Sequence, residues 1–413
     1  MAPSSLSPPC GPLLKGLLRS RLAVRLPAGR PGKVLRLPQP VPDYGSALER
    51  SARKLLQHQA ALDRERMEAD ALVPDLLRRR AERQLLLLRN DPRFYTWGVL
   101  ERLLERSRDG ILADSAESER LAALALDLAP HLDTAYYGLT RIEDMRARAW
   151  ATIAEVRRMR SDFAGAGEAF AAARAHLGAG TGDSLESAIL FESEATLRRC
   201  QRRFSAAHAL LLRAIEAFVE NGEDQRTGQA LVSLAAVHRD EGAPSRAIPL
   251  LHEALRRIDG DREPRLLLSA QHHLADSLAA AGRFMEARGA LIRARPLYRR
   301  FPDGWTESHL RRLRGRIALG CGQTAEAEAE LLGARAGFLA LGSTFEAALV
   351  LLDLAALYAR QERTAEVKTL AVEAAGAFAE CGVVREMQAA MALHREAEES
   401  EGAYSGSSMP MMW

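Results

Sequence analysis

Histidines and acidic residues are the natural candidates for catalysis or metal binding in this 413-residue chain. The segment His252-Glu253 begins like the H-E-x-x-H helix motif of zinc peptidases, but position 256 is Arg, so the second ligand is missing. His272 and Asp276 are four apart on one predicted helix face. Two ligands without a third favour satisfied polar contacts over a metal site. The sequence therefore predicts no metal site.

Phosphate-binding and nucleophile motifs are also incomplete. Residues 178–182 are Gly-Ala-Gly-Thr-Gly, but no predicted strand precedes them and the Lys of a phosphate-binding loop is absent. The turn at residues 320–322 fails the same test, and Ser, His and acidic residues show no recognisable nucleophile context. We expect no catalytic residue and no cofactor. A hydrolase or nucleotide-dependent enzyme is the least favoured class, and the chain is predicted not to be an enzyme.

A periodic pair of small residues organises the chain from about residue 149 to 375. The first members recur at steps of 41, 40, 40, 40 and 40 residues, at Ala154, Ala195, Ala235, Ala275, Gly315 and Ala355. The second members follow twelve positions later, at Ala166, Ala207, Ala247, Ala287, Ala327 and Val367. Apolar residues at helical spacing flank each position, and small residues let two helix backbones cross closely. A period of this length with two helices per unit predicts an α-solenoid.

These positions resemble the tetratricopeptide repeat. The first unit supplies Trp150, Ile153-Ala154, Phe163, Ala166, Phe170 and Ala173, and the fourth supplies Leu274-Ala275, Gly282, Phe284, Ala287, Leu291 and Ala294. The resemblance covers roughly residues 146–380. It implies an all-α fold, an α-solenoid of stacked antiparallel helical hairpins wound as a right-handed superhelix. The typical period is about 34 residues, so the longer period predicts longer helices and a deeper groove, similar to the arrays of bacterial regulators.

Composition divides the rest of the chain. Residues 1–42 hold nine prolines and seven basic residues but no acidic residue, which predicts a disordered tail; a transit peptide and a misassigned start remain alternatives. Residues 43–110 are predicted to be an N-terminal helical segment broken at Pro74, and residues 111–145 a degenerate leading repeat. After the six repeats of residues 146–380, we expect a capping helix over 381–400 and a disordered tail over 401–413.

Charge and cysteine usage narrow the partners and the compartment. The 57 basic and 54 acidic residues give a net charge of +3, which argues against direct nucleic-acid binding by bulk electrostatics. Four widely spaced cysteines form no disulfide framework, and the longest apolar runs are far shorter than the roughly 20 residues that span a bilayer. We expect a cytoplasmic bacterial protein without a membrane partner.

In arrays similar to this one, the first helix of each hairpin lines the concave groove. Groove positions precede its central small residue by six and three and follow it by one, four and five. They give Arg148, Glu155, Arg158, Glu192, Arg199, Gln229, Arg239, Asp240, His272, Asp276, His309, Arg312, Arg316 and Arg360. Arginine outnumbers acid here, which predicts a peptide with carboxylates that guanidinium groups grip. The alternative is that these arginines only solvate an exposed face or pair with neighbouring acids.

Two functions of different class follow from this groove. The first is a non-enzymatic scaffold that binds a peptide or protein segment. The alternative is a ligand- or peptide-responsive regulator that acts in signalling or transcription control through a separate partner, because no helix-turn-helix pattern is found before the repeats. The sequence names neither the partner nor the oligomeric state.

Overall fold

A computed structural model describes residues 44–406, all of whose regular elements are helices. The chain divides into two units, residues 1–57 and 58–413. Of the first unit, the structure describes residues 44–57, which form the start of helix α2 (Tyr44–Leu77). The predicted tail of residues 1–42 and most of the predicted C-terminal tail lie outside the described residues. No helix of the described part is long and apolar enough to cross a membrane.

The N-terminal helices of the second unit build their own core. Helix α2 is followed by α3 (Ala81–Asn90), the 3₁₀ turn η1 (Pro92–Phe94), α4 (Trp97–Gly110), α5 (Ser115–Leu128), the 3₁₀ turn η2 (Ala129–His131) and α6 (Thr134–Tyr137). Leu76, Leu88, Leu103 and Leu128 are fully buried together in this core. The predicted two helices are present, but the break lies after Leu77 rather than at Pro74, because α2 continues through Pro74 and Arg78 N–H still bonds to the Pro74 carbonyl at 3.2 Å.

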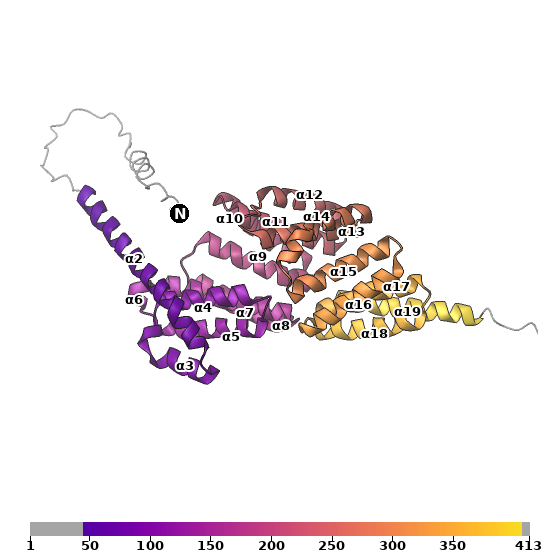
Figure 1. Ribbon diagram of the computed structural model, residues 1–413, viewed down its shortest axis with the longest axis horizontal. Coiled ribbons are helices and arrows are strands. Elements are labelled where there is room, and N and C mark those ends of the chain that lie inside the picture. Colours follow the sequence, from indigo (N-terminus) through magenta and orange to yellow (C-terminus); the bar gives the residue numbers. More distant parts are fainter. Residues whose placement is uncertain (1–43, 407–413) are drawn as a thin grey trace, which may run out of the picture. The chain divides into compact units, whose positions relative to one another are not determined.

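The six predicted hairpins are present as consecutive helix pairs (Figure 1). They are α7 (Leu139–Met159) with α8 (Phe163–Gly178), α9 (Ser184–Cys200) with α10 (Phe204–Glu220), α11 (Asp224–Glu241) with α12 (Pro244–Arg257), α13 (Pro264–Ala280) with α14 (Phe284–Arg300), α15 (Gly304–Gly320) with α16 (Thr324–Ala340), and α17 (Thr344–Arg360) with α18 (Thr364–Glu380). Helix α19 (Val384–Gly406) packs on α18 and runs past residue 400, so the expected tail begins inside a helix. The predicted all-α solenoid is confirmed.

The period of 40 residues follows directly from helix length. Each helix from α13 to α18 has 17 residues, and turns of three residues separate these helices. The additional residues relative to a shorter repeat therefore lengthen the helices, as the sequence predicts. A 17-residue helix rises about 25 Å at 1.5 Å per residue, which leaves room for several inward-facing turns per hairpin.

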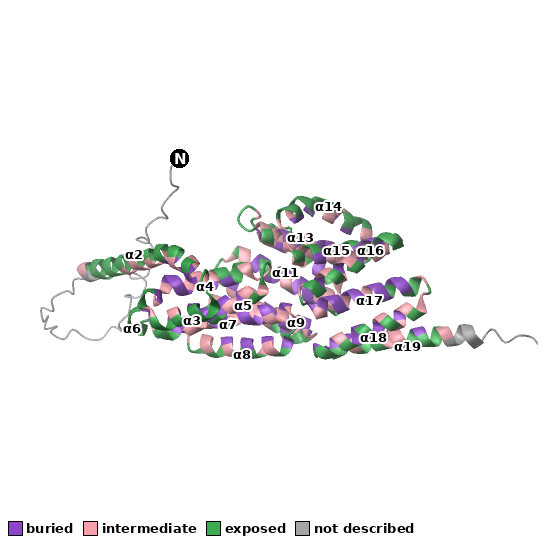
Figure 2. Cartoon of the chain, turned by 60° about the horizontal axis from the view of Figure 1, so that its bottom comes forward, coloured by how far each residue is buried: buried purple, intermediate pink, exposed green. Residues whose placement is uncertain are grey.

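The small positions lie where the sequence places them. All twelve are buried: five of the first members are alanines with no exposed surface, and Val367 is 3% exposed. At Gly315 a Cβ would lie 2.6 Å from Leu331 Cγ, so the glycine of the fifth hairpin reflects a close helix approach. Figure 2 shows the result: α17 is buried along most of its length, whereas α14 and α18 carry an exposed face.

One residue in each hairpin turn adopts a left-handed backbone conformation. It falls at Ser161, Arg202, Gly242, Gly282, Gly322 and Glu362, with the period of the repeat. Glycine suits this conformation, whereas other residues are strained there by roughly 1 kcal/mol or more. Three hairpins nevertheless use Ser, Arg and Glu. Two of these side chains, those of Ser161 and Arg202, contact the sixth hairpin or α19.

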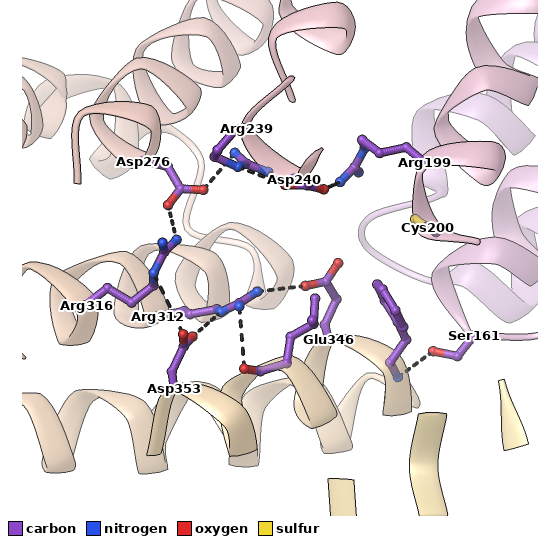
Figure 3. Close-up of polar contacts among 12 residues, drawn as sticks. Ser161, Arg199, Cys200, Arg239, Asp240, Asp276, Arg312, Arg316, Glu346 and Asp353 are labelled. Carbon is purple, nitrogen blue, oxygen red and sulfur yellow. Dashed lines mark hydrogen bonds and ion pairs between the residues drawn. The ribbon is translucent and has the colours of Figure 1, made fainter. Parts of the chain in front are cut away.

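These contacts join the first two hairpins to the sixth hairpin and α19, an arrangement that we call the closing contact. Phe345 of α17 donates its backbone N–H to Ser161 Oγ at 2.9 Å (Figure 3), and its ring lies 5.1 Å from that of Phe163. Arg202 forms an ion pair with Glu386 of α19. Apolar residues from α7 to α9 and from α17 to α19 share one buried core.

Candidate functional site

A cavity of about 530 Å³ lies on the face formed by the first helices of the hairpins. Side chains of α9, α11, α13, α15 and α17 line it, and Arg158 of α7 reaches its edge. These helices are neighbours because each hairpin stacks on the next through its small residues. We call this feature the first-helix cavity. Its volume is in the range of pockets that hold small molecules or a few residues of a peptide.

A continuous series of ion pairs crosses the cavity wall (Figure 3). In the order of contact it runs through Arg199, Asp240, Arg239, Asp276, Arg316, Asp353, Arg312 and Glu346. We call it the ion-pair chain. Because its members come from the first helices of the second to the sixth hairpin, it connects five repeats.

The distances show which links are tight. Arg239 contacts Asp240 and Asp276 at 2.7 Å each, and Arg312 Nε lies 2.7 Å from Asp353 Oδ2. Arg316 pairs closely with Asp276, whereas its Nε lies 3.8 Å from Asp353 Oδ1. The contact between Arg316 and Asp353 is therefore the longest in the ion-pair chain.

Charge pairing sets the ionisation of the two central carboxyls. Burial alone would raise the pKa of Asp240, but Arg239, Arg199 and Arg202 hold it well below its ordinary value. Asp276 shows the same balance, with burial opposed by Arg239 and Arg316, and its pKa is also lowered. Both carboxylates therefore stay charged at neutral pH, and each is shared between arginines.

Three histidines also line the cavity, and one of them, His273, lies 3.0 Å from Arg239 of the ion-pair chain. Burial lowers the pKa of His272 and of His309 to about 3, and burial also holds the pKa of His273 well below its ordinary value. His272 Nδ1 lies 2.7 Å from Tyr298 Oη, and the ring of His309 lies 4.8 Å from that of Trp305. Uncharged imidazoles thus add neutral groups that are able to form hydrogen bonds to the charged lining of the cavity.

Nine of the fourteen predicted groove residues line the cavity. They are Arg158, Arg199, Arg239, Asp240, His272, Asp276, His309, Arg312 and Arg316. Among the described residues, five others do not line it: Arg148 pairs with Glu186, Glu155 pairs with Arg158, Glu192 accepts hydrogen bonds from Gln229 and Ser233, and Arg360 donates to the Leu319 carbonyl. That any of them binds a partner stays a prediction.

Glu192 has an unusual environment among these five. Its carboxylate accepts a hydrogen bond from Gln229 Nε2 at 2.9 Å and another from Ser233 Oγ at 3.0 Å. Burial nevertheless raises its pKa to about 7, because the two neutral donors only partly replace lost hydration. Glu192 therefore links the second and third hairpins through a group that titrates near neutral pH.

The repeat offsets used to predict groove positions missed two acidic residues that offset the positive charge of the cavity. Glu346 and Asp353 lie nine and two positions before Ala355 of α17, outside the expected offsets, yet both line the cavity. Their spacing of seven residues places both on one helix face. Arg202 was missed because it lies in a turn between helices.

The cavity consequently has little free positive charge. Seven arginines and four carboxylates line it. The three arginines in excess of these carboxylates form ion pairs with acids that do not line the cavity: Arg158 with Glu155, Arg202 with Glu386, and Arg265 with Asp303. The excess of arginine in the predicted groove set is thus offset by internal acids, the alternative that the sequence left open.

Comparisons with known proteins place the fold. No protein-family model matches the chain, and neither does any curated protein sequence. A Rap protein in complex with competence and sporulation factor is similar in structure, with a TM-score of 0.53 and 13% identity over 83% of this chain and 98% of that one.

Two further structures share weaker similarity. Aspartyl phosphate phosphatase F from Bacillus subtilis has a TM-score of 0.40 and 15% identity over 72% of this chain and 79% of its own. The apo form of RapI has a TM-score of 0.42 and 14% identity over 85% and 98%. On the strength of the Rap complex, whose protein is a helical-repeat protein of tetratricopeptide type, this chain has the tetratricopeptide-like helical-repeat fold.

Proposed function

We propose that this chain is a non-enzymatic interaction protein that binds a peptide or an extended protein segment in the first-helix cavity. The observation that carries the proposal is the cavity itself, which five successive first helices line with both charged and neutral polar groups. Such a surface offers hydrogen-bond donors and acceptors to a polypeptide backbone along several repeats.

An acidic group on the bound segment fits one position best. Arg316 is held closely by Asp276 but only loosely by Asp353, at 3.8 Å. A ligand carboxylate could insert at this link and share the guanidinium group, which offers several N–H donors. The remaining arginines are already satisfied by acids of the chain, so we propose one acidic anchor rather than a strongly acidic ligand.

The apolar and aromatic residues of the cavity lining would hold the rest of the segment. Leu268, Leu313 and Leu349 line the cavity together with Trp305 and His309. Apolar and aromatic side chains supply most of the free energy when a segment leaves water, and polar groups fix its orientation. We therefore propose a segment with one carboxylate and at least one large apolar side chain. The similar Rap protein, solved with competence and sporulation factor bound, supports a binding role for this fold.

A second candidate, a ligand-responsive regulator, is favoured by the closing contact. Ser161 and Phe345 bring the first and sixth hairpins together. Glu346 and Asp353 of the cavity wall lie on α17 with Phe345, and Arg312, which pairs with both, lies on α15. A ligand that rearranges α17 would therefore also disturb the contact with Ser161. A ligand shifts such an equilibrium only by its difference in affinity for the two states.

Selection from a random peptide library tests the main proposal. Enriched peptides are measured by fluorescence anisotropy against the full chain and against Ser269→Trp, which fills the cavity from α13 without removing an ion pair. Met285→Trp on the exposed surface of α14 is the matched control. We expect at least tenfold weaker binding to S269W and unchanged binding to M285W.

Two results would count against this function. Either no peptide is enriched, or the enriched peptides bind S269W as tightly as the parent chain. Small-angle X-ray scattering with the same peptides separates the two candidates: an unchanged radius of gyration supports a scaffold, and a saturable change supports a regulator.

A further inference from the structure

A cluster of metal-ligating side chains lies away from the first-helix cavity. It consists of His208 on α10 and of His238 and Glu241 on α11, and one potential ligand atom from each lies within 4.8 Å of the others. None of the three residues lines the cavity. The cluster joins the second helix of the second hairpin to the first helix of the third. The proposed peptide-binding function does not involve these residues.

The geometry is close to that of a three-ligand metal site. His208 Nε2 lies 3.4 Å from Glu241 Oε2, and His238 Nδ1 lies 3.9 Å from the same oxygen. In a tetrahedral zinc site, ligands about 2.0–2.1 Å from the metal lie roughly 3.4 Å from one another. The His208–Glu241 distance already has this value, the His238–Glu241 pair is about half an ångström longer, and the two imidazole nitrogens lie within 4.8 Å of each other. A small side-chain rotation would bring all three atoms onto one ion.

His238 carries an unused ligand atom. Its Nδ1 is buried and has no hydrogen-bond partner within the described part of the chain. Buried polar atoms are normally hydrogen-bonded, so an unpaired imidazole nitrogen aimed at another histidine and a carboxylate needs an explanation.

The two imidazole rings are also held in place before any ion binds. Their centroids are 4.6 Å apart in an edge-to-face arrangement, and both side chains are largely shielded from solvent, whereas Glu241 is more exposed. Glu241 is the last residue of α11, where the partial negative charge of the helix end favours a cation. The exposed carboxylate side leaves a direction from which a fourth ligand, such as water, can approach.

We propose that His208, His238 and Glu241 bind a zinc ion that fastens the second hairpin to the third. Two imidazole nitrogens and one carboxylate oxygen are a donor set that zinc accepts, and it leaves the fourth tetrahedral position for water. The site binds and stabilises; no chemical step is assigned to it. It is independent of the peptide site, so either proposal can fail without the other.

Cobalt substitution tests this site in the full, tag-free chain. Co²⁺ is titrated into the protein, and its visible absorption bands report a tetrahedral nitrogen and oxygen environment; Zn²⁺ is then added in competition. We expect saturation at one equivalent, displacement by Zn²⁺, and a higher unfolding temperature with bound Zn²⁺. His208→Ala and His238→Ala should each weaken Co²⁺ binding by tenfold to a hundredfold, and Glu241→Gln by a smaller factor.

His252→Ala is the matched control, because His252 is an exposed residue of α12 outside the cluster. It should leave the titration unchanged. Glu241→Gln removes an exposed group and serves as the variant least able to disturb folding, which circular dichroism checks for every protein. Absence of saturable binding, binding that persists in both histidine variants, or a thiolate-to-cobalt charge-transfer band from the cysteines would each overturn the proposal.

Discussion

The backbone N–H of Phe345 donates a hydrogen bond of 2.9 Å to Ser161 Oγ, although 184 residues separate the two. The bond is buried and lies within a core shared by the first and sixth hairpins. Repeat arrays usually gain stability only from neighbouring units. Here the ends of the array also contact each other, so the six hairpins are expected to unfold as one cooperative unit.

Replacing Ser161 by Ala tests the closing contact. The change leaves the buried N–H of Phe345 without its acceptor, which costs about 1–3 kcal/mol of unfolding free energy. Chemical denaturation followed by circular dichroism measures the loss. Glu362→Ala is the control, because Glu362 has the same left-handed backbone in the sixth hairpin but is exposed. Equal effects of the two changes would mean that the turn conformation, not the hydrogen bond, matters.

Asp276→Asn tests the ion-pair chain. Asp276 is shared by Arg239 and Arg316, so neutralising it leaves two largely buried guanidinium groups without a central partner. Breaking a buried pair in this way costs about 3–5 kcal/mol, and we expect a fall of that size in unfolding free energy. The exposed pair of Arg283 and Glu286 provides a control, since Glu286→Gln should have no measurable effect. A D276N protein as stable as its parent would refute a structural role for the ion-pair chain.

Adjacent alanines on α17 test the close helix packing. Ala355 is completely buried at the helix crossing, whereas Ala356 is exposed. Ala355→Leu forces extra atoms into a packed interface and is expected to cost about 1–3 kcal/mol or more, while Ala356→Leu should be tolerated. Thermal unfolding of both variants gives the comparison. If A355L were tolerated as well as A356L, the small residues would not be setting the helix spacing.

Glu192→Gln tests the buried carboxyl between the second and third hairpins. A folded-state pKa of about 7, above the ordinary value of 4.5, means that the folded protein binds a proton that the unfolded chain releases between these values. Stability from this group is therefore greatest below pH 4.5 and is lost as the pH rises through 7, by at most about 3 kcal/mol.

The pH difference curve isolates this contribution. His272 and His309 act with the opposite sign, because their pKa of about 3 makes the folded state lose stability as the pH falls below 6.5. The unfolding free energy of E192Q minus that of the parent should thus increase from pH 4.5 to 7.5, because only the parent loses the contribution of the protonated carboxyl. Glu216→Gln, on the exposed surface of α10, should give a flat difference curve. A flat curve for E192Q would contradict the assigned burial of this carboxyl.

Much of the fold could be predicted because its determinants are local and periodic. The small residues at Ala154, Ala235 and Ala355 mark helix crossings, and each crossing depends on residues within one hairpin. The same periodicity identified Arg199, Arg239 and Asp276 on the first helices. Here position within the repeat determines which face a side chain occupies.

The rest depended on contacts that no local pattern encodes. Glu346 and Asp353 of α17 lie outside the offsets of the repeat, and only the three-dimensional pairing with Arg312 reveals their role. The bond between Ser161 and Phe345 joins residues from opposite ends of the array. One partial signal was available: Ser161 and Arg202 stand in turns where other repeats use glycine, and both side chains make contacts across the array, whereas the third such residue, Glu362, is exposed.

Photo-cross-linking tests the central claim, that a segment binds in the first-helix cavity, most directly. A library-selected peptide carries a benzophenone amino acid in place of its large apolar residue, and mass spectrometry locates the adducts on the full chain. We predict adducts at Leu268, Leu313, Leu349 or Trp305, all of which line the cavity. Adducts confined to Met285 and Ile292, which are exposed on α14, would contradict the account.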